Sequence, residues 1–174
     1  MNDIIKAMEE RRSIRKFKAE MPSREDIAQI LVAGTFAASG MGRQAVKMIA
    51  VTNKKWRDAL SEANRKIGGW QEGFDPFYGA PVVVLVLGDK SVGTSIYDGS
   101  LVMGNLMLAA HSLGLGSIWI HRAKEELEQD EWKKMLSDLG IEGEWEGIGH
   151  CAIGYADQEP EAAPRKPDRV YWVE

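Results

Sequence analysis

The chain has 174 residues, of which 44% are hydrophobic and 28% charged, and its formal net charge is −4 at pH 7. This length and composition predict one globular domain that is long enough to bury a substantial core. The acidic balance argues against general nucleic-acid binding. Cys151 is the only cysteine in the sequence, which excludes an internal disulfide and a cysteine-rich zinc site and favours a reducing, cytoplasmic compartment.

The sequence predicts neither a signal peptide nor a membrane anchor. Asp3, Lys6 and Glu9 interrupt the apolar character of the first residues. The longest apolar run, residues 80–87, is far shorter than the ~20 residues that span a bilayer. We therefore expect a soluble protein with no membrane partner.

A basic segment follows a short amphipathic helix that is predicted over residues 2–10. Three arginines and a serine in this segment can surround a phosphate group, because guanidinium forks and hydroxyls pair with phosphate oxygens: Arg11, Arg12, Ser13 and Arg15. A solvated basic face is the alternative interpretation. Ile14 and Phe17 interleave with the charges, which indicates that alternate residues face inward.

The following elements alternate helix and strand. Ser23 is expected to cap a helix that continues to residue 33, and a loop of small residues over 37–44 can let a flat ligand approach the backbone, although such a loop is also an ordinary connector. Strands are predicted at 48–52 and 147–155, a helix at 54–66, and a central strand buried on both faces at 81–87. Residues 124–139 are predicted as one helix with a solvated acidic face formed by Glu125, Glu126, Glu128 and Glu131.

A loop over residues 68–79 mixes glycines with four aromatic side chains: Trp70, Phe74, Phe77 and Tyr78. Long loops of this kind form lids or pocket walls, while aromatics also pin loops to a core. We favour the pocket wall. The tail is expected to be an extended connection around residues 164–167 followed by a terminal strand at 170–173.

The segment 98–122 is predicted to organise the chain. Its helix is apolar on nearly every face, so it must be buried against the sheet, other helices, a cofactor or a second subunit. Asp98 or Ser100 is expected to cap its start and Gly114 to end it, and a buried strand follows at 117–120. The order of the glycines relative to strand and helix excludes a dinucleotide fingerprint.

Four stretches, in this order along the chain, resemble the FMN-dependent nitroreductase family: residues 11–17, 39–44, 105–120, and 154–155 with 164–167. The resemblance implies a single domain over 1–174 with an α+β fold, whose central mixed, mainly antiparallel sheet is flanked by helices. It also implies an intertwined homodimer with two FMN sites at the interface, in which the C-terminal segment 157–174 reaches across to the partner subunit.

The resemblance further implies the residues that contact the cofactor. They are Arg11, Arg12, Ser13, Arg15, Arg165 and Lys166 around the FMN phosphate and ribityl chain, Ser39, Gly40, Met41 and Gln44 beside the isoalloxazine, and Ile120 and His121 with backbone N–H groups toward flavin N5. The implied reaction is ping-pong hydride transfer from NADH or NADPH to nitroaromatics, quinones or similar small acceptors. The aromatics Trp70, Phe74, Phe77 and Tyr78 are candidates to stack on such substrates.

Two positions depart from the family pattern. Gly42 stands where the family loop usually has asparagine, so Arg43 or water has to replace that contact with the flavin. His121 stands where a smaller residue is common, and it is either a structural histidine or a proton donor beside the substrate. The alternatives are a flavoenzyme specialised for flavin fragmentation or dehalogenation, and a non-catalytic flavin-binding or sensor module.

Overall fold

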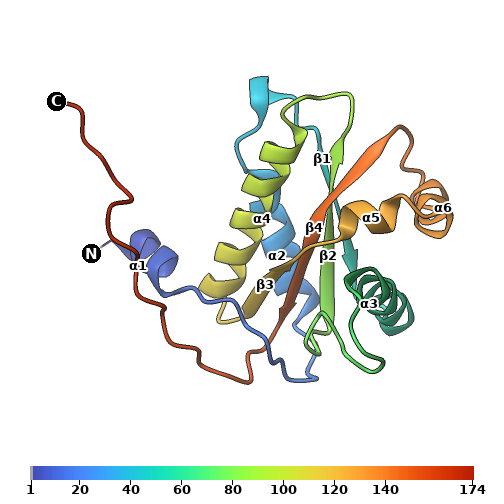
Figure 1. The fold of residues 1–174 in the computed structure, drawn as a ribbon, viewed down its shortest axis with the longest axis horizontal. Coiled ribbons are helices and arrows are strands. Elements are labelled where there is room, and N and C mark those ends of the chain that lie inside the picture. The colour runs from blue at the N-terminus through green and yellow to red at the C-terminus, as the bar shows by residue number, and fades with distance from the viewer. Residues whose placement is uncertain (1) are drawn as a thin grey trace.

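In the computed structural model, which describes residues 2–174, helices cover both faces of a central sheet (Figure 1). The helices are α1 (Asp3–Glu10), α2 (Arg24–Thr35), the 3-10 turn η1 (Gly40–Gly42), α3 (Lys54–Gly68), α4 (Ser95–Ser112), α5 (Ala123–Leu127) and α6 (Asp130–Asp138). The strands are β1 (Val46–Val51), β2 (Val82–Asp89), β3 (Gly116–Ile120) and β4 (Trp145–Gly154). None of the helices described over residues 2–174 is long and apolar enough to cross a membrane.

The sheet has the order β1-β2-β4-β3, and every pair of neighbouring strands is antiparallel. A β-bulge interrupts the β2–β4 pairing between Val86 and Leu87. The expected α+β fold with a mainly antiparallel sheet is confirmed. Its mixed character is confined to one isolated parallel bridge, between Ser13 and Ser117.

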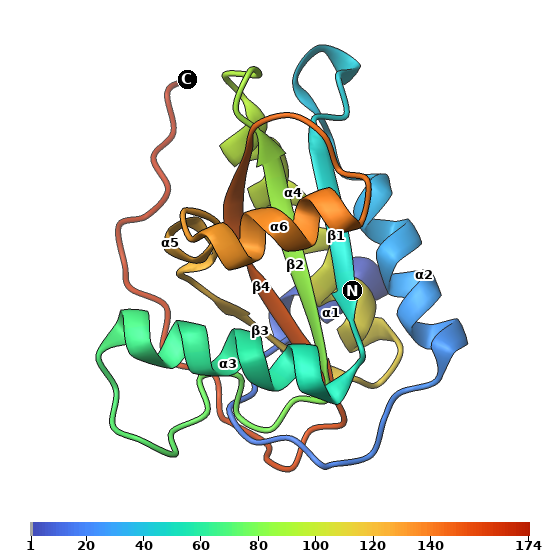
Figure 2. The ribbon, with the colours of Figure 1, turned by 90° about the vertical axis from the view of Figure 1, so that its right-hand side faces the viewer.

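Strand β2 carries the core on both of its faces, as predicted for residues 81–87. Val83, Leu85 and Leu87 pack into one cluster with residues of α3, α5 and α6, and the intervening valines pack into a second cluster with residues of α2 and α4. Figure 2 shows α3 and α6 in front of the sheet and α4 behind it. Since successive side chains of a strand point to opposite faces, a strand covered on both sides is apolar throughout.

Helix α4 begins at Ser95, three residues before Asp98, the earlier of the two predicted caps. Its N-cap is Thr94, so Asp98 and Ser100 are not caps, and the Asp98 side chain is buried in the first turn instead. Gly114 follows the helix with φ 74°, the left-handed conformation that was predicted to end it. Tyr97 and Leu101 leave part of this apolar helix exposed.

The acidic segment forms two helices rather than the single predicted one. Gln129, with φ −85° and ψ 141°, has extended backbone and separates α5 from α6. The prediction that Glu126 lies on a solvated face is also wrong, because its side chain is 1% exposed. Gly147 on β4 lies directly against the backbone of Ala123, so the start of α5 packs closely on the sheet.

The two ends of the chain lie apart from the sheet (Figure 1). Helix α1 has no buried residue, and residues 159–174 belong to no helix or strand. The predicted terminal strand at 170–173 is therefore wrong for the isolated chain, since no strand of its own sheet pairs with it. Tyr171 and Trp172 are 81% and 83% exposed.

We expect Gly147→Ala to destabilise the fold. An added Cβ would lie 2.2 Å from the carbonyl carbon and oxygen of Ala123, and because this neighbour is backbone, the strand or the helix has to shift. The free energy of unfolding measured in urea should fall by about 1–3 kcal/mol. The control Gly93→Ala, in a loop with nothing within 4 Å of the added Cβ, should change it by less than about 0.5 kcal/mol. Equal effects would contradict this account.

Candidate functional site

The basic segment 11–17 lies along the free edge of β3. Backbone contacts fix it there: Ser13 forms the parallel bridge to Ser117, and the N–H of Ile14 donates to the Ser117 carbonyl at 3.1 Å. Ile14 and Phe17 are buried at 6% and 8% exposure, so both apolar side chains face inward, but they are three positions apart and the segment does not alternate strictly. These contacts hold the polar residues of segment 11–17 beside β3.

The arginines of this segment have no carboxylate partners. Over residues 2–174, none of Arg11, Arg12 and Arg15 takes part in an ion pair. Arg11 and Arg12 line a cavity of about 400 Å³ together with Gly116 and Ser117, and Glu10 and Glu159 lie at the same cavity. Arg12 Nη1 donates to the backbone carbonyls of Glu9 and Arg11. Guanidinium groups without a carboxylate partner, beside backbone and hydroxyl donors, are a donor set that fits a phosphate ester.

The loop of small residues, 39–44, is fixed by the buried carboxylate of Asp98. Asp98 accepts hydrogen bonds from the Gly40 N–H at 3.0 Å and from the Ser39 hydroxyl at 3.3 Å. A Cβ on Gly40 would lie 2.4 Å from the Thr94 hydroxyl, so only glycine fits there. Met41, 88% exposed, is presented at the tip with φ 55°.

The structure does not bring this loop to the basic segment of the same chain. Gly40 is bound to Asp98 in the first turn of α4, whereas a guanidinium nitrogen of Arg11 lies 4.0 Å from Met107 Sδ. Met107 lies nine positions after Asp98 on α4, which corresponds to roughly 14 Å along the helix axis. Arg165 and Lys166 are exposed on the tail, where the Arg165 guanidinium donates to the Ala163 carbonyl.

Three of the four predicted substrate aromatics form a continuous row. The ring centroids of Trp70 and Phe74 are 5.1 Å apart and those of Phe74 and Tyr78 6.0 Å apart. The guanidinium of Arg122 lies 4.2 Å from the Trp70 ring, and the N–H of Phe17 donates to the Tyr78 carbonyl. The row thus links the end of β3 to the basic segment.

Phe77 does not belong to this row. Its side chain is fully buried and its ring lies 5.1 Å from that of His150. It pins the loop to the core, as the alternative interpretation of the aromatics foresaw, so we no longer count it among the candidates for substrate contact. His121 is exposed, with its ring 5.7 Å from Trp119.

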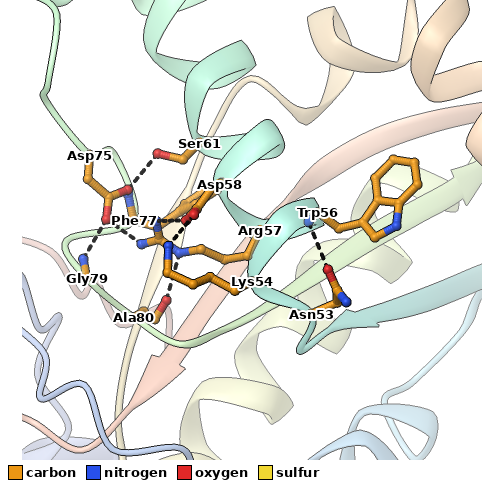
Figure 3. A network of polar contacts seen from close by, with 10 residues as sticks. All are labelled: Asn53, Lys54, Trp56, Arg57, Asp58, Ser61, Asp75, Phe77, Gly79 and Ala80. Atoms are coloured by element: carbon orange, nitrogen blue, oxygen red, sulfur yellow. Dashed lines mark hydrogen bonds and ion pairs between the residues drawn. The ribbon is translucent and has the colours of Figure 1, made fainter.

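Asp75 closes the aromatic loop onto α3 (Figure 3). Its carboxylate is paired with Arg57, accepts a hydrogen bond from the Ser61 hydroxyl at 2.7 Å and accepts two more from the N–H groups of Phe77 and Gly79. The Arg57 Nε also donates to the Ala80 carbonyl at 3.0 Å. Sequence analysis missed this network because nothing in the local pattern links a loop aspartate to a helix arginine.

The pKa of Asp75 lies below its usual 3.8. Burial of the carboxyl raises the pKa, but the hydrogen bonds from Arg57 and Ser61 and the charge of Arg57 outweigh that effect. A folded-state pKa below the unfolded one means that the stabilisation is present above the unfolded pKa and is lost as pH falls through the folded one.

A second polar network lies in the core behind the end of β3. Asn64 on α3 donates hydrogen bonds to the His121 carbonyl and to Glu126, each at 2.8 Å, and Glu126 lies 2.7 Å from His150 Nε2. From the sequence, Glu126 was expected on the surface, His150 falls within the strand predicted at 147–155, and Asn64 was not singled out. Asparagine has a low helix propensity, so its presence within a predicted helix was the one signal in the sequence that could have marked Asn64.

Comparison with known proteins identifies this architecture. The model described as "Nitroreductase family" matches residues 8–155. The Methanothermobacter thermautotrophicus protein named as an NADH dehydrogenase/NAD(P)H nitroreductase is 32% identical over 126 residues, which are 67% of this chain and 60% of that protein. The Vibrio harveyi NADPH-flavin oxidoreductase is 30% identical over 180 residues, which are 98% of this chain and 72% of that protein. The crystal structure of a Bacteroides fragilis nitroreductase with bound FMN is 26% identical, covers 100% of both chains and gives a TM-score of 0.91.

Four antiparallel strands flanked by helices define an α+β protein with the fold of the Bacteroides fragilis enzyme. The family model extends over most of the sequence, from the basic segment to the end of β4. The chain belongs to the nitroreductase family.

We expect Asp75→Asn to loosen the aromatic loop. The free energy of unfolding at pH 7 should fall by about 2 kcal/mol, because hydrogen bonds to a charged group are lost from a part-buried site. The variant should also lose less stability than the parent when the pH is lowered below 3.8. Urea unfolding at several pH values measures both effects.

The matched control for this prediction is Asp58→Asn. Asp58 also contacts Arg57, at 3.3 Å, but its side chain is 46% exposed, so the change should be below about 1 kcal/mol. If the two asparagine variants unfolded alike at every pH, Asp75 would not be the anchor of this loop.

Proposed function

We propose that this chain is an FMN-dependent NAD(P)H oxidoreductase that acts in the cytoplasm as a homodimer. The observation that carries the proposal is the set of unpaired arginines held beside a cavity at the β3 edge. The relatives support the cofactor and the electron donor, since one is named an NADPH-flavin oxidoreductase and another is a nitroreductase with bound FMN.

The basic segment would hold the phosphate end of FMN. Arg11, Arg12 and Arg15 offer guanidinium forks without competing carboxylate partners, and Ser13 adds a hydroxyl. Because the backbone of the segment is tied to Ser117, these groups are oriented before the cofactor binds. Ordering them in advance lowers the entropic cost of binding.

When bound, FMN supplies the hydride chemistry, accepting a hydride from NADH or NADPH and passing it to a second substrate. The protein would position the reactants: the 39–44 loop would pack beside the flat ring through Ser39, Gly40, Met41 and Gln44. The backbone N–H groups of Ile120 and His121 would face flavin N5. Trp70, Phe74 and Tyr78 provide aromatic surface on which a nitroaromatic or quinone stacks.

The homodimer explains why the site is incomplete in one chain. The 39–44 loop and the arginines of one chain are separated along α4, so we infer that a second subunit supplies the loop for each site. The exposed apolar residues support such an interface: Ile4, Ile5 and Met8 on α1, Ile96, Tyr97 and Leu101 on α4, and Val170, Tyr171, Trp172 and Val173 on the tail. We propose that 1–174 is one domain whose segment 157–174 crosses to the partner and brings Arg165 and Lys166 to the phosphate.

The visible absorbance spectrum of the purified protein, followed by anaerobic addition of NADH and NADPH, tests the proposed function. Oxidised-flavin bands that bleach are expected, and the faster donor identifies the preferred nicotinamide. A protein that neither carries FMN nor binds added FMN would refute the proposal. Bands that never bleach would leave a flavin-binding protein without the proposed activity.

We expect Arg11→Ala to weaken FMN binding by at least about tenfold, because a charge-assisted hydrogen bond to phosphate is lost. Titration of the apoprotein with FMN measures the dissociation constant, and the difference between parent and variant should shrink as salt is raised. Arg24→Ala removes an exposed arginine at the start of α2 and serves as the control with unchanged affinity. Equal affinities of the parent and Arg11→Ala would place the phosphate elsewhere.

We expect the double substitution of Tyr171 and Trp172 to serine to shift the protein from dimer toward monomer. These exposed side chains would lose the apolar area that they bury on the partner. Light scattering coupled to size-exclusion chromatography over a concentration series gives the mass. The control Lys55→Ala, which changes an exposed residue of α3, should remain dimeric. A parent that is monomeric at all concentrations would contradict the proposed assembly.

A further inference from the structure

The side-chain amide of Asn64 is fully buried and uses both of its N–H groups. Nδ2 donates to the carbonyl oxygen of His121 and to Oε1 of Glu126, each at 2.8 Å. A carbonyl and a carboxylate both accept hydrogen bonds, so the nitrogen, and not the oxygen, of the Asn64 amide has to face them. Few side chains offer two donors on one uncharged nitrogen, which explains an asparagine at this mid-helix position.

The carboxylate of Glu126 also lies close to a histidine of β4. Its Oε2 lies 2.7 Å from Nε2 of His150, and the two side chains are 1% and 0% exposed. The contact connects α5 to β4, while Asn64 connects α5 to α3. The two hydrogen bonds from Nδ2 restrain the Asn64 amide, because turning it would take the donor away from both the His121 carbonyl and Glu126 Oε1.

This anchor fixes the direction of the peptide between His121 and Arg122. There is no cis peptide bond in the described chain, and across a trans peptide the C=O and the N–H point in opposite directions. The His121 carbonyl points toward Asn64 in the core, so the N–H of Arg122 points away from the core.

Arg122 itself has a backbone conformation that a residue with a side chain rarely adopts, with φ 80° and ψ 7°. Such conformations cost free energy and persist only where the surroundings enforce them. Here the Arg122 carbonyl accepts a hydrogen bond from the Glu126 N–H at 3.0 Å, and its guanidinium lies 4.2 Å from the Trp70 ring. Together with Asn64, these contacts hold the strained turn.

We propose that Asn64 is a positioning residue that directs the N–H of Arg122 to flavin N5. The inference rests on the proposed function, which places FMN at the end of β3, and it deepens that function by naming the donor and the group that orients it. The donor is then the amide that follows His121, one position beyond the pair named from the sequence. Asn64 acts from the opposite side of the peptide and does not touch the cofactor.

The test compares the binding of FMN and 5-deaza-FMN, an analogue in which a C–H group replaces N5 and removes the hydrogen-bond acceptor. The apoprotein should bind FMN about fivefold more tightly than the analogue, the effect of one hydrogen bond. In Asn64→Ala this preference should fall toward one, because the peptide is free to turn. A general loss of stability would weaken binding of both flavins equally and leave the preference intact.

Asn105→Ala is the matched control. The Asn105 amide donates to the Ala33 carbonyl at 3.0 Å, so the substitution removes the same kind of hydrogen bond between α4 and α2. Its preference for FMN should equal that of the parent. If Asn64→Ala does not fold, Asn64→Ser, whose hydroxyl lies closer to the backbone and does not replace the amide contacts, serves for the same comparison.

An undiminished preference in the Asn64 variant would overturn the proposal, and so would a parent that binds FMN and the analogue equally. Either result leaves the proposed function intact if NAD(P)H bleaches the bound FMN of the parent. A parent that binds neither flavin would instead refute the proposed function together with this inference.

Discussion

The buried hydrogen bond from Asn64 to the His121 carbonyl joins the elements on which the candidate site depends. It connects α3 to the turn that follows β3, and through Glu126 and His150 it includes α5 and β4. A buried carboxylate is costly without partners, so the contacts of Asn64 restrain the turn more strictly than apolar packing alone would. The strained backbone of Arg122 is tolerated at the turn for this reason.

The remaining parts of the site are attached to the same frame by similar means. Asp75 ties the aromatic loop to α3, Asp98 ties the 39–44 loop to α4, and the bridge at Ser117 ties the basic segment to β3. In each case a polar group binds backbone atoms, and the exposed side chain of Met41 is left available to a ligand. Catalysis carried by a flavin requires a placed cofactor more than a set of acidic and basic groups, and these anchors serve placement.

The distribution of exposed residues agrees with a chain that completes its site by pairing. Helix α1 and the tail contribute nothing to the core of their own chain, and α4 leaves apolar side chains uncovered at its N-terminal end. A large uncovered apolar surface is costly in water, whereas it is usual at an obligate interface. In the proposed homodimer, the separation of the 39–44 loop from the arginines along α4 would follow from sharing each site between two subunits.

The sequence by itself determined the parts whose cause is local. The apolar run of β2, the cap at Ser23, the left-handed glycine that ends α4 and the inward-facing Ile14 and Phe17 all follow from periodicity and backbone preference. The family resemblance added the candidate cofactor residues. The break at Gln129 escaped prediction because acidic residues continue on both sides of it and no glycine or proline marks it.

Only the tertiary structure decided which polar residues work together. Glu126 has the sequence environment of a solvated glutamate, yet α5 turns it toward Asn64 and His150. Phe77 resembles its aromatic neighbours in the sequence, yet the contacts of Asp75 direct it into the core. The physical reason is that a side chain's partner is set by distance in space, and residues 64, 126 and 150 are brought together by the packing of three elements. Periodicity reports which face of an element is buried, and it carries no information about which buried groups meet.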